Sequence, residues 1–133
     1  MINPISTSVS GLMASSKKVA VAASNIANAD VVGSTDPNSP NQAYAAQTTQ
    51  DVSTAGGGVK TISLNRTPAF VPSFEPDSPF ADSKGMVNAP NVNLDEELIN
   101  TKIAENAYKA NVTALKAGIE MQDTLREALD HKS

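Results

Sequence analysis

The stretch NLDEELINTKIAENAYKANVTALKAGIEM, residues 93–121, has the strongest helical pattern in the sequence. Asn93 and Glu96 form a capping-box-like pair. Asp95 and Glu97 add negative charge to the first turn, where the helix dipole favours it. Apolar residues recur at helical spacing beyond this stretch, so we expect one long helix over about residues 94–130.

The expected C-terminal helix carries two apolar stripes. At about 100° per residue, one stripe consists of Leu94, Leu98, Tyr108, Val112, Leu115 and Ile119. The other, roughly opposite, consists of Ile99, Ile103, Ala107, Ala110, Ala114, Ala117, Met121, Leu125 and Ala128. A helix at the edge of a two-layer domain needs a single stripe. The second stripe therefore predicts contacts with other molecules, or else burial in a fold that the pattern does not reveal.

A second helix is expected over residues 4–29. Asn3 can be its N-cap, and Pro4 its first residue, where a missing N–H costs nothing. Its apolar residues alternate at spacings of four and three, which predicts a heptad seam with one polar interruption. This seam consists of Ile5, Val9, Leu12, Ser16, Val19, Ala23 and Ile26. The residues on the other side of this helix are mostly small, which permits close approach of another backbone.

The first helix ends in ASNIANADVVG, residues 23–33, which contains two asparagines where one cap would suffice. Each side-chain amide has two donor hydrogens and an acceptor oxygen. One amide can satisfy terminal carbonyls. The other can bond the backbone of the C-terminal helix or of the turn at 30–33. Alternatively, both Asn25 and Asn28 are only helix caps.

The chain divides into three segments: an N-terminal helix in residues 1–30, a middle segment in 31–92 and a C-terminal helix in 93–133. Gly, Pro, Ser, Asn and Thr dominate the middle segment, and helical periodicity is absent there. Strands are expected at 43–52, 58–65 and 68–74, with a turn before Met86 and Val87. The sequence thus predicts a mainly α fold with a small irregular β element and long loops.

Composition limits both the core and the partners. The chain has 133 residues, 4% aromatic residues, no Trp, no Cys and a net charge of −4. Alanine buries little area, so we expect the protein to complete its core with neighbouring molecules. The sequence contains no basic cluster of the kind that would indicate nucleic-acid binding. The N-terminal residues resemble no secretory signal, and no apolar run is long enough to span a membrane.

Candidates for catalysis or metal binding are poor. His131 is the only histidine, lies near the end of the sequence and is expected to be solvated. The carboxylates of Glu75, Asp77 and Asp82 are the only acidic cluster in a loop, and nearby prolines favour turn roles for them. No cofactor, metal or small-molecule substrate is indicated.

Two motifs carry a family resemblance. SNIANAD at 24–30 resembles the signature of the flagellar rod, hook and hook-associated axial family. Glu97, Ala104, Tyr108, Ala110 and Asn111 are similar to the pattern in that family's closing helix. The intervening stretches GGVK, FEPDSPFADSKGMV and APNVN resemble proximal-rod members of the family in order and spacing.

The resemblance implies a structural subunit of the proximal rod, part of the flagellar drive shaft. It implies coiled-coil-like pairing of the terminal helices as an inner layer of a helical array in the periplasm. It also implies type III export without a cleaved signal, and contacts with other rod proteins, with copies of itself and with the export-gate adaptor at the rod base. No direct membrane insertion is implied.

Two sets of residues follow as expected sites. The family motif and helix-docking set is Ser24, Asn25, Ile26, Ala27, Asn28 and Ala29. The expected assembly interface is Ile5, Val9, Leu12, Val19, Ile26, Leu98, Ile103, Tyr108, Asn111, Val112, Leu115, Ile119, Met121 and Leu125.

Two other functions remain open from the sequence. A soluble helical adaptor or chaperone of the export system would bind one partner without polymerising. A cell-wall enzyme would need two carboxylates across a cleft, with Glu75 as the first candidate.

Overall fold

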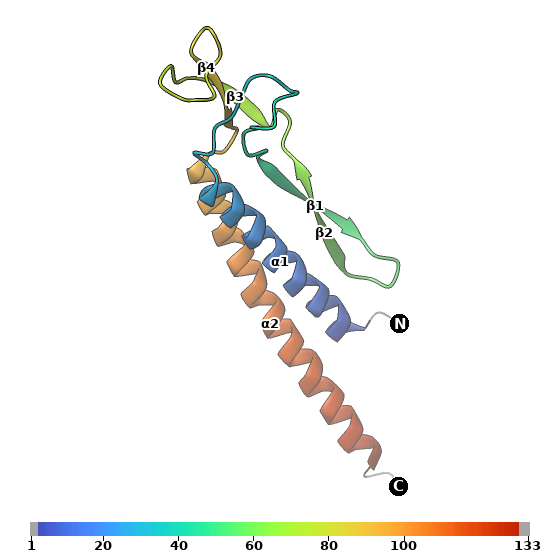
Figure 1. Ribbon diagram of the computed structural model, residues 1–133. Coiled ribbons are helices and arrows are strands. Elements are labelled where there is room, and N and C mark those ends of the chain that lie inside the picture. The colour runs from blue at the N-terminus through green and yellow to red at the C-terminus, as the bar shows by residue number, and fades with distance from the viewer. Residues whose placement is uncertain (1–2, 131–133) are drawn as a thin grey trace.

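Two long helices run side by side in opposite directions and dominate the fold (Figure 1). The computed structural model describes residues 3–130. Helix α1 spans Pro4–Ala27, and helix α2 spans Leu94–Asp130. Between them in sequence come four short strands. The β3–β4 pair and its loops lie at the end where α1 stops and α2 starts, and the opposite end of α2 extends past the start of α1 (Figure 1).

Local chemistry sets both ends of α1. The Asn3 side chain accepts a hydrogen bond from the Ile5 backbone N–H at 3.0 Å, and Pro4 follows as the first helical residue. At the other end, the Asn28 side-chain amide donates to the Ser24 carbonyl at 2.8 Å. The same carbonyl also accepts the Asn28 backbone N–H at 3.1 Å, so Asn28 caps the helix with both its backbone and its side chain.

The start of α2 is capped in the same way. The Asn93 side chain accepts hydrogen bonds from the backbone N–H groups of Asp95 and Glu96. The first turn carries Asp95, Glu96 and Glu97, whose charges oppose the positive end of the helix dipole. The Glu96 side chain does not complete a capping box, because it pairs with Arg66.

The strands form two separate antiparallel pairs. Strand β1 (Gln47–Ser53) pairs with β2 (Val59–Asn65), with Gln47 opposite Asn65, and this hairpin lies along α1. Strand β3 (Phe70–Phe74) pairs with β4 (Met86–Pro90), with Phe70 opposite Pro90. The first strand starts at Gln47, later than the expected residue 43. Residues 43–46 are held instead by contacts with the end of α1 and the turn after it: the Tyr44 hydroxyl donates to Asn25, and the Tyr44 N–H donates to the Val31 carbonyl.

The core consists mostly of small side chains. The buried apolar residues are Ala14, Val21, Ala22, Ala43, Ala46, Val87 and Ala104. Small side chains allow close helix packing but remove little apolar area from water. In residues 3–130, no helix combines the length and the hydrophobicity that crossing a membrane requires.

The mainly α fold with a small β element is confirmed, but the expected seam of α1 is not its packing surface. Ser16, Ala23 and Ile26 of that seam are exposed, and Ile5, Val9, Leu12 and Val19 are only half-buried. The buried side is the small one, formed by Ser8, Ala14, Ser15, Val21, Ala22 and Asn25. This face packs inward because its small side chains allow the backbones to approach closely, whereas large side chains would hold the helices apart.

Candidate assembly surfaces and the joint that orients the helices

A polar cluster with two buried residues, Asn25 and Glu97, at its centre joins α1, β1 and α2. We call it the joint: Ser24, Asn25, Tyr44, Arg66, Glu96 and Glu97. Asn25 is fully buried, on the last turn of α1. Its Oδ1 accepts from the Gln47 backbone N–H and the Tyr44 hydroxyl, both at 3.0 Å. Its Nδ2 donates to the Gln47 carbonyl and to Glu97 Oε1, both at 2.8 Å. One amide therefore satisfies both backbone groups at the start of β1 and also reaches α2.

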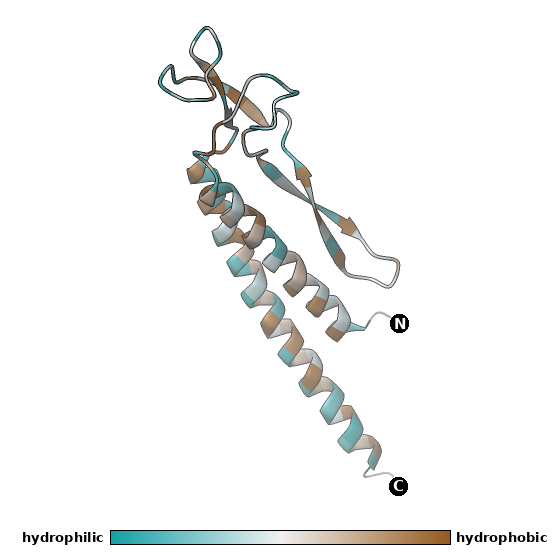
Figure 2. Cartoon of the chain, in the orientation of Figure 1, coloured by the Kyte–Doolittle hydropathy of each residue, from teal (hydrophilic) through white to brown (hydrophobic). Residues whose placement is uncertain are grey.

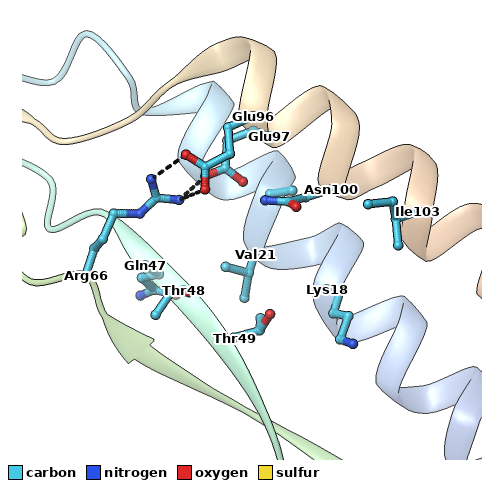
Figure 3. Close-up of a pocket in the computed structure, with 11 residues that line it drawn as sticks. Lys18, Val21, Gln47, Thr48, Thr49, Arg66, Glu96, Glu97, Asn100 and Ile103 are labelled. Carbon is cyan, nitrogen blue, oxygen red and sulfur yellow. Dashed lines mark hydrogen bonds and ion pairs between the residues drawn. The ribbon is translucent and has the colours of Figure 1, made fainter.

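Glu97 is the acidic member of the joint and is only 2% exposed. Besides Asn25, it accepts a hydrogen bond from Arg66 Nη2 at 2.7 Å. Arg66 directly follows β2, and its Nη1 also pairs with Glu96 Oε2 at 3.2 Å (Figure 3). A buried carboxylate requires a cation and hydrogen-bond donors. The joint supplies both and links the hairpin to the first turn of α2.

The joint lies beside a hollow between α1, the hairpin and α2 (Figure 3). Lys18, Thr48, Asn100 and Ile103 line its wall together with members of the joint. Lys18 pairs with Asp51 of β1 at 2.6 Å and so fastens the hairpin to α1. The Lys18 ammonium and then the Thr61 hydroxyl, both hydrogen-bonded to Asp51, hold the pKa of that carboxyl below its usual value.

The two helices approach closely along small residues. A Cβ added at Gly118 of α2 would lie 3.5 Å from Ile5, in ordinary contact, whereas one added at Gly11 of α1 would overlap Asn111. On α2 the residues that face inward recur every seven positions: Glu97, Ala104, Asn111 and Gly118. We call this row the inner row of α2. Both expected apolar stripes lie beside it and not on it.

Most of the expected interface residues of α2 are exposed in the subunit. Those with exposed side chains are Leu98, Ile103, Tyr108, Ile119, Met121 and Leu125, and those that are half-buried are Asn111, Val112 and Leu115. Figure 2 shows hydrophobic bands recurring along both helices, including the part of α2 that extends past α1. The exposed helix surface is therefore rich in apolar residues.

The family-motif residues divide between the joint and the end of α1. Ser24 is half-buried and hydrogen-bonds the Tyr44 hydroxyl at 3.0 Å, while Asn25 is the centre of the joint. Ile26 and Ala27 are exposed. Asn28 caps the helix, and the Ala29 N–H donates to the Ile26 carbonyl. The sequence led us to expect a backbone partner on α2 or at 30–33, whereas Asn25 uses the backbone of Gln47 and a side chain of α2.

Sequence reasoning missed Tyr44 and Arg66 as members of the joint. Each lies in the middle segment and carries no motif that would link it to a helix. Glu97 was part of the family pattern, but its acidic charge was assigned only to the helix dipole. A buried cation partner could not be identified before the fold placed Arg66 beside it.

A charged strip occupies another side of α2. Glu105 pairs with Lys102 at 2.9 Å and also with Lys109. The hydrogen bond from Lys109 and then that from Lys102 lower the pKa of Glu105 to about 2. This strip is solvated and separates the apolar surfaces.

The loop carboxylates act in turns. Asp82 accepts from the backbone N–H groups of Met86 and Lys84, and these bonds lower its pKa. Glu75 accepts a hydrogen bond from the Ser73 hydroxyl. The lowered pKa of Asp82 is the opposite of the raised pKa typical of a general acid. His131 lies outside the described residues.

Comparisons with known proteins show which family the sequence resembles. The family model for flagella basal body rod proteins matches residues 5–34, and the model for the C-terminal part of flagellar basal body rod FlgEFG proteins matches residues 83–127. The flagellar basal-body rod protein FlgC of Salmonella typhimurium is 38% identical over 121 residues, which cover 86% of this chain and 87% of the relative.

Relatives with lower identity occur in other bacteria. The FlgC protein of Agrobacterium fabrum is 29% identical over 125 residues, covering 91% of this chain and 87% of the relative. That of Aquifex aeolicus is 28% identical over 132 residues, covering 96% of each chain. The similarity thus includes the middle segment as well as the two helices.

Proposed function

Because the chain belongs to the FlgC family of flagellar basal-body rod proteins, we propose that its exposed helix faces assemble it helically into the proximal rod. It is a structural subunit of the basal-body rod and not an enzyme. In this proposal the subunit assembles through the exposed face of α1 and both apolar stripes of α2. The two helices pair in a coiled-coil-like inner layer.

The observation that carries this proposal is the exposed apolar surface of α2. Leu98, Ile99, Ile103 and Met121 are each between 59% and 68% exposed. Large exposed apolar surfaces mark interaction sites. Since these residues lie on a helix whose inner side is already occupied by α1, the stripes are free to contact other subunits.

Assembly into a rod also requires that the contact surfaces differ. An interface between two unlike patches repeats from copy to copy and produces an open helical array. Outer α1, the two stripes of α2 and the β element are unlike in shape and chemistry. The partners in this proposal are copies of this chain, other rod proteins and the export-gate adaptor at the rod base, within the periplasm-spanning rod.

The joint has a role of its own in this proposal. It fixes the hairpin and the first turn of α2 relative to the end of α1, so that all exposed faces keep one orientation. A rod that transmits torque needs rigid subunits. The network of Asn25, Glu97 and Arg66 provides that rigidity without large apolar side chains.

The proposal is tested by comparing a strain that lacks the gene for this protein with the same strain complemented by that gene. We expect basal bodies purified from the complemented strain to contain the protein, detected by immunoblotting. Those from the deletion strain should lack a complete rod in electron micrographs. An intact rod in the deletion strain, with only export impaired, would instead support an adaptor role.

A further inference from the structure

Within residues 3–130, no other helix lies beside the last three turns of α2, and this segment carries our further inference. The contacts of Gly118 with Pro4 and Ile5 show that the capped start of α1 lies level with this glycine. Helix α2 continues to Asp130. We call residues 119–130 the overhang. At 1.5 Å per residue its length is about 18 Å, and Figure 1 shows it extending past α1.

The inner row of α2 continues into the overhang. It contains Glu97, Ala104, Asn111 and Gly118, and the next residue seven positions on is Leu125. Ala104 and Gly118 are buried, whereas Leu125 is 60% exposed. The row thus contains the small buried residues Ala104 and Gly118, together with two polar residues, where α1 is close, and a large apolar residue beyond the start of α1.

A groove lies between the start of α1 and the beginning of the overhang. Asn3, Pro4 and Ile5 of the α1 start form one wall, and Met121, Gln122 and Leu125 form the other. The Asn3 cap and Pro4 stop α1 there, so α1 does not continue along the overhang in its own subunit. A helix from elsewhere can occupy the same position as a continuation of the intramolecular interface.

Net charge favours α1 over a second α2 as the partner helix. At about 100° per residue the acidic side chains of the overhang lie roughly 140–160° from Leu125, so they attract α1 at long range and not through direct ion pairs. The overhang contains Glu120, Asp123, Glu127 and Asp130 but only one cation, Arg126. The first turn of α2 is also acidic, so the α2 helix of a second copy would repel the overhang at that turn. Helix α1 has no acidic residue, and its two charges are Lys17 and Lys18. Lys17 has no ion-pair partner among residues 3–130.

The outer side of α1 also has a suitable shape. Met13 is 69% exposed, and Ser16 and Ala20 beside it are small and exposed. A face of small residues around one large apolar side chain lets another helix approach closely. We propose that the overhang of one copy packs against the outer face of α1 in a second copy, an inference that rests on the proposed function.

Engineered disulfides test the contact, because the chain contains no cysteine. Leu125→Cys is combined in turn with Val9→Cys, Met13→Cys, Ser16→Cys and Ala20→Cys. Within one subunit the two positions of each pair are at least about 16 Å apart along the helix axis. A disulfide needs Cα atoms within about 7 Å, so any bridge must join two copies.

We expect mild oxidation of purified basal bodies to produce dimers and longer ladders with at least one of the four pairs. The matched control replaces Leu125→Cys with Glu127→Cys, two positions along the helix on the charged side of the overhang, and should give several-fold less dimer. Gln122→Cys serves in place of Leu125→Cys if the latter does not enter the basal body.

Two results would overturn the inference. One is the lack of a bridge from any pair in basal bodies that contain the variants. The other is equal bridging by the Glu127→Cys control, which would indicate random proximity. In both cases the protein is still present in the rod, so the proposed function stands. Basal bodies without the wild-type protein would instead refute the proposed function itself.

Discussion

Gly11 of α1 lies directly against the side chain of Asn111 of α2. A Cβ added to the glycine would lie 2.5 Å from Asn111 Oδ1 and 2.7 Å from its Nδ2. Real Cβ atoms do not approach other atoms so closely. The same amide is held in place because Nδ2 donates to the Ala107 carbonyl at 2.9 Å. Close approach of the helices here thus depends on the absence of a side chain at Gly11.

Gly11→Ala should destabilise the subunit, although alanine is the better helix former by about 1 kcal/mol. The added methyl overlaps Asn111 and forces the helices apart, at a cost of about 1–3 kcal/mol. Urea unfolding of the purified subunit measures the change. Adding Asn111→Ala should recover part of the loss. A stabilised Gly11→Ala single variant would contradict the close approach.

Asn25→Ala should cost about 3 kcal/mol or more, because it leaves the Gln47 backbone groups and Glu97 Oε1 without this partner. Thermal unfolding of the purified subunit tests this expectation. Asn28→Ala is the matched control, since it removes a single bond to Ser24 and should cost only about 1 kcal/mol. Equal losses for the two variants would mean that both asparagines are only caps.

Arg66→Met should destabilise the subunit by about 3–5 kcal/mol, because Glu97 would remain buried without its cation. The double variant Arg66→Met with Glu97→Gln should be more stable than Arg66→Met alone. Lys109→Gln, which breaks an exposed ion pair with Glu105, should leave the midpoint of urea unfolding unchanged. A small loss for Arg66→Met would show that water reaches the joint.

Leu98→Asp should abolish motility while leaving the isolated subunit as stable as wild type, within about 0.5 kcal/mol. The side chain is 59% exposed, so the carboxylate is solvated until another subunit covers it. Motility in soft agar and immunoblots of basal bodies measure assembly. Lys109→Gln makes the same change in net charge on the charged strip and should remain motile. Wild-type swimming by Leu98→Asp would remove this stripe from the interface.

The Lys18–Asp51 bridge should make hairpin attachment depend on pH. The folded-state pKa of Asp51 is lowered, so its stabilising contribution is present above the unfolded pKa, near 3.8. The contribution is lost as pH falls through the folded value. Both side chains are partly exposed, so the effect should stay below about 1 kcal/mol. We expect the stability difference between wild type and Asp51→Asn to shrink between pH 6 and pH 3.

That stability difference should also shrink in high salt, because solvent-exposed ion pairs are screened. Chemical unfolding followed by circular dichroism at each pH and salt concentration provides the measurement. A difference that grows as pH falls would have the wrong sign for a carboxyl with a lowered pKa.

The helices illustrate how far local pattern determines this fold. Asn3 and Pro4 start α1, and Asn93 with three acidic residues starts α2. These signals act within one turn, so the sequence alone places the helix starts. Three of the four strands are also indicated by local β-forming residues, although β1 starts four residues later than expected. Strand β4 and the pairing of the strands were not predicted.

The packing of the helices was not predictable in the same way. The heptad seam of α1 indicated Ile5, Val9 and Leu12, yet the buried side holds Ser8, Ala14 and Ser15. Periodicity identifies a face that is apolar. Periodicity does not tell whether the partner of that face belongs to the same chain. In this protein α1 packs within the subunit through its face of small residues, because small residues allow the backbones to approach closely.

By itself, the sequence determined where the helices lie, that the middle segment is β and loop, and that the chain has more apolar helix surface than a core of small residues can bury. These properties follow from neighbours within a few residues along the chain. Only the tertiary structure decided that Asn25, Arg66 and Glu97 share one buried network. Those residues are 19 to 72 positions from their partners, and no local interaction links them until the chain has folded.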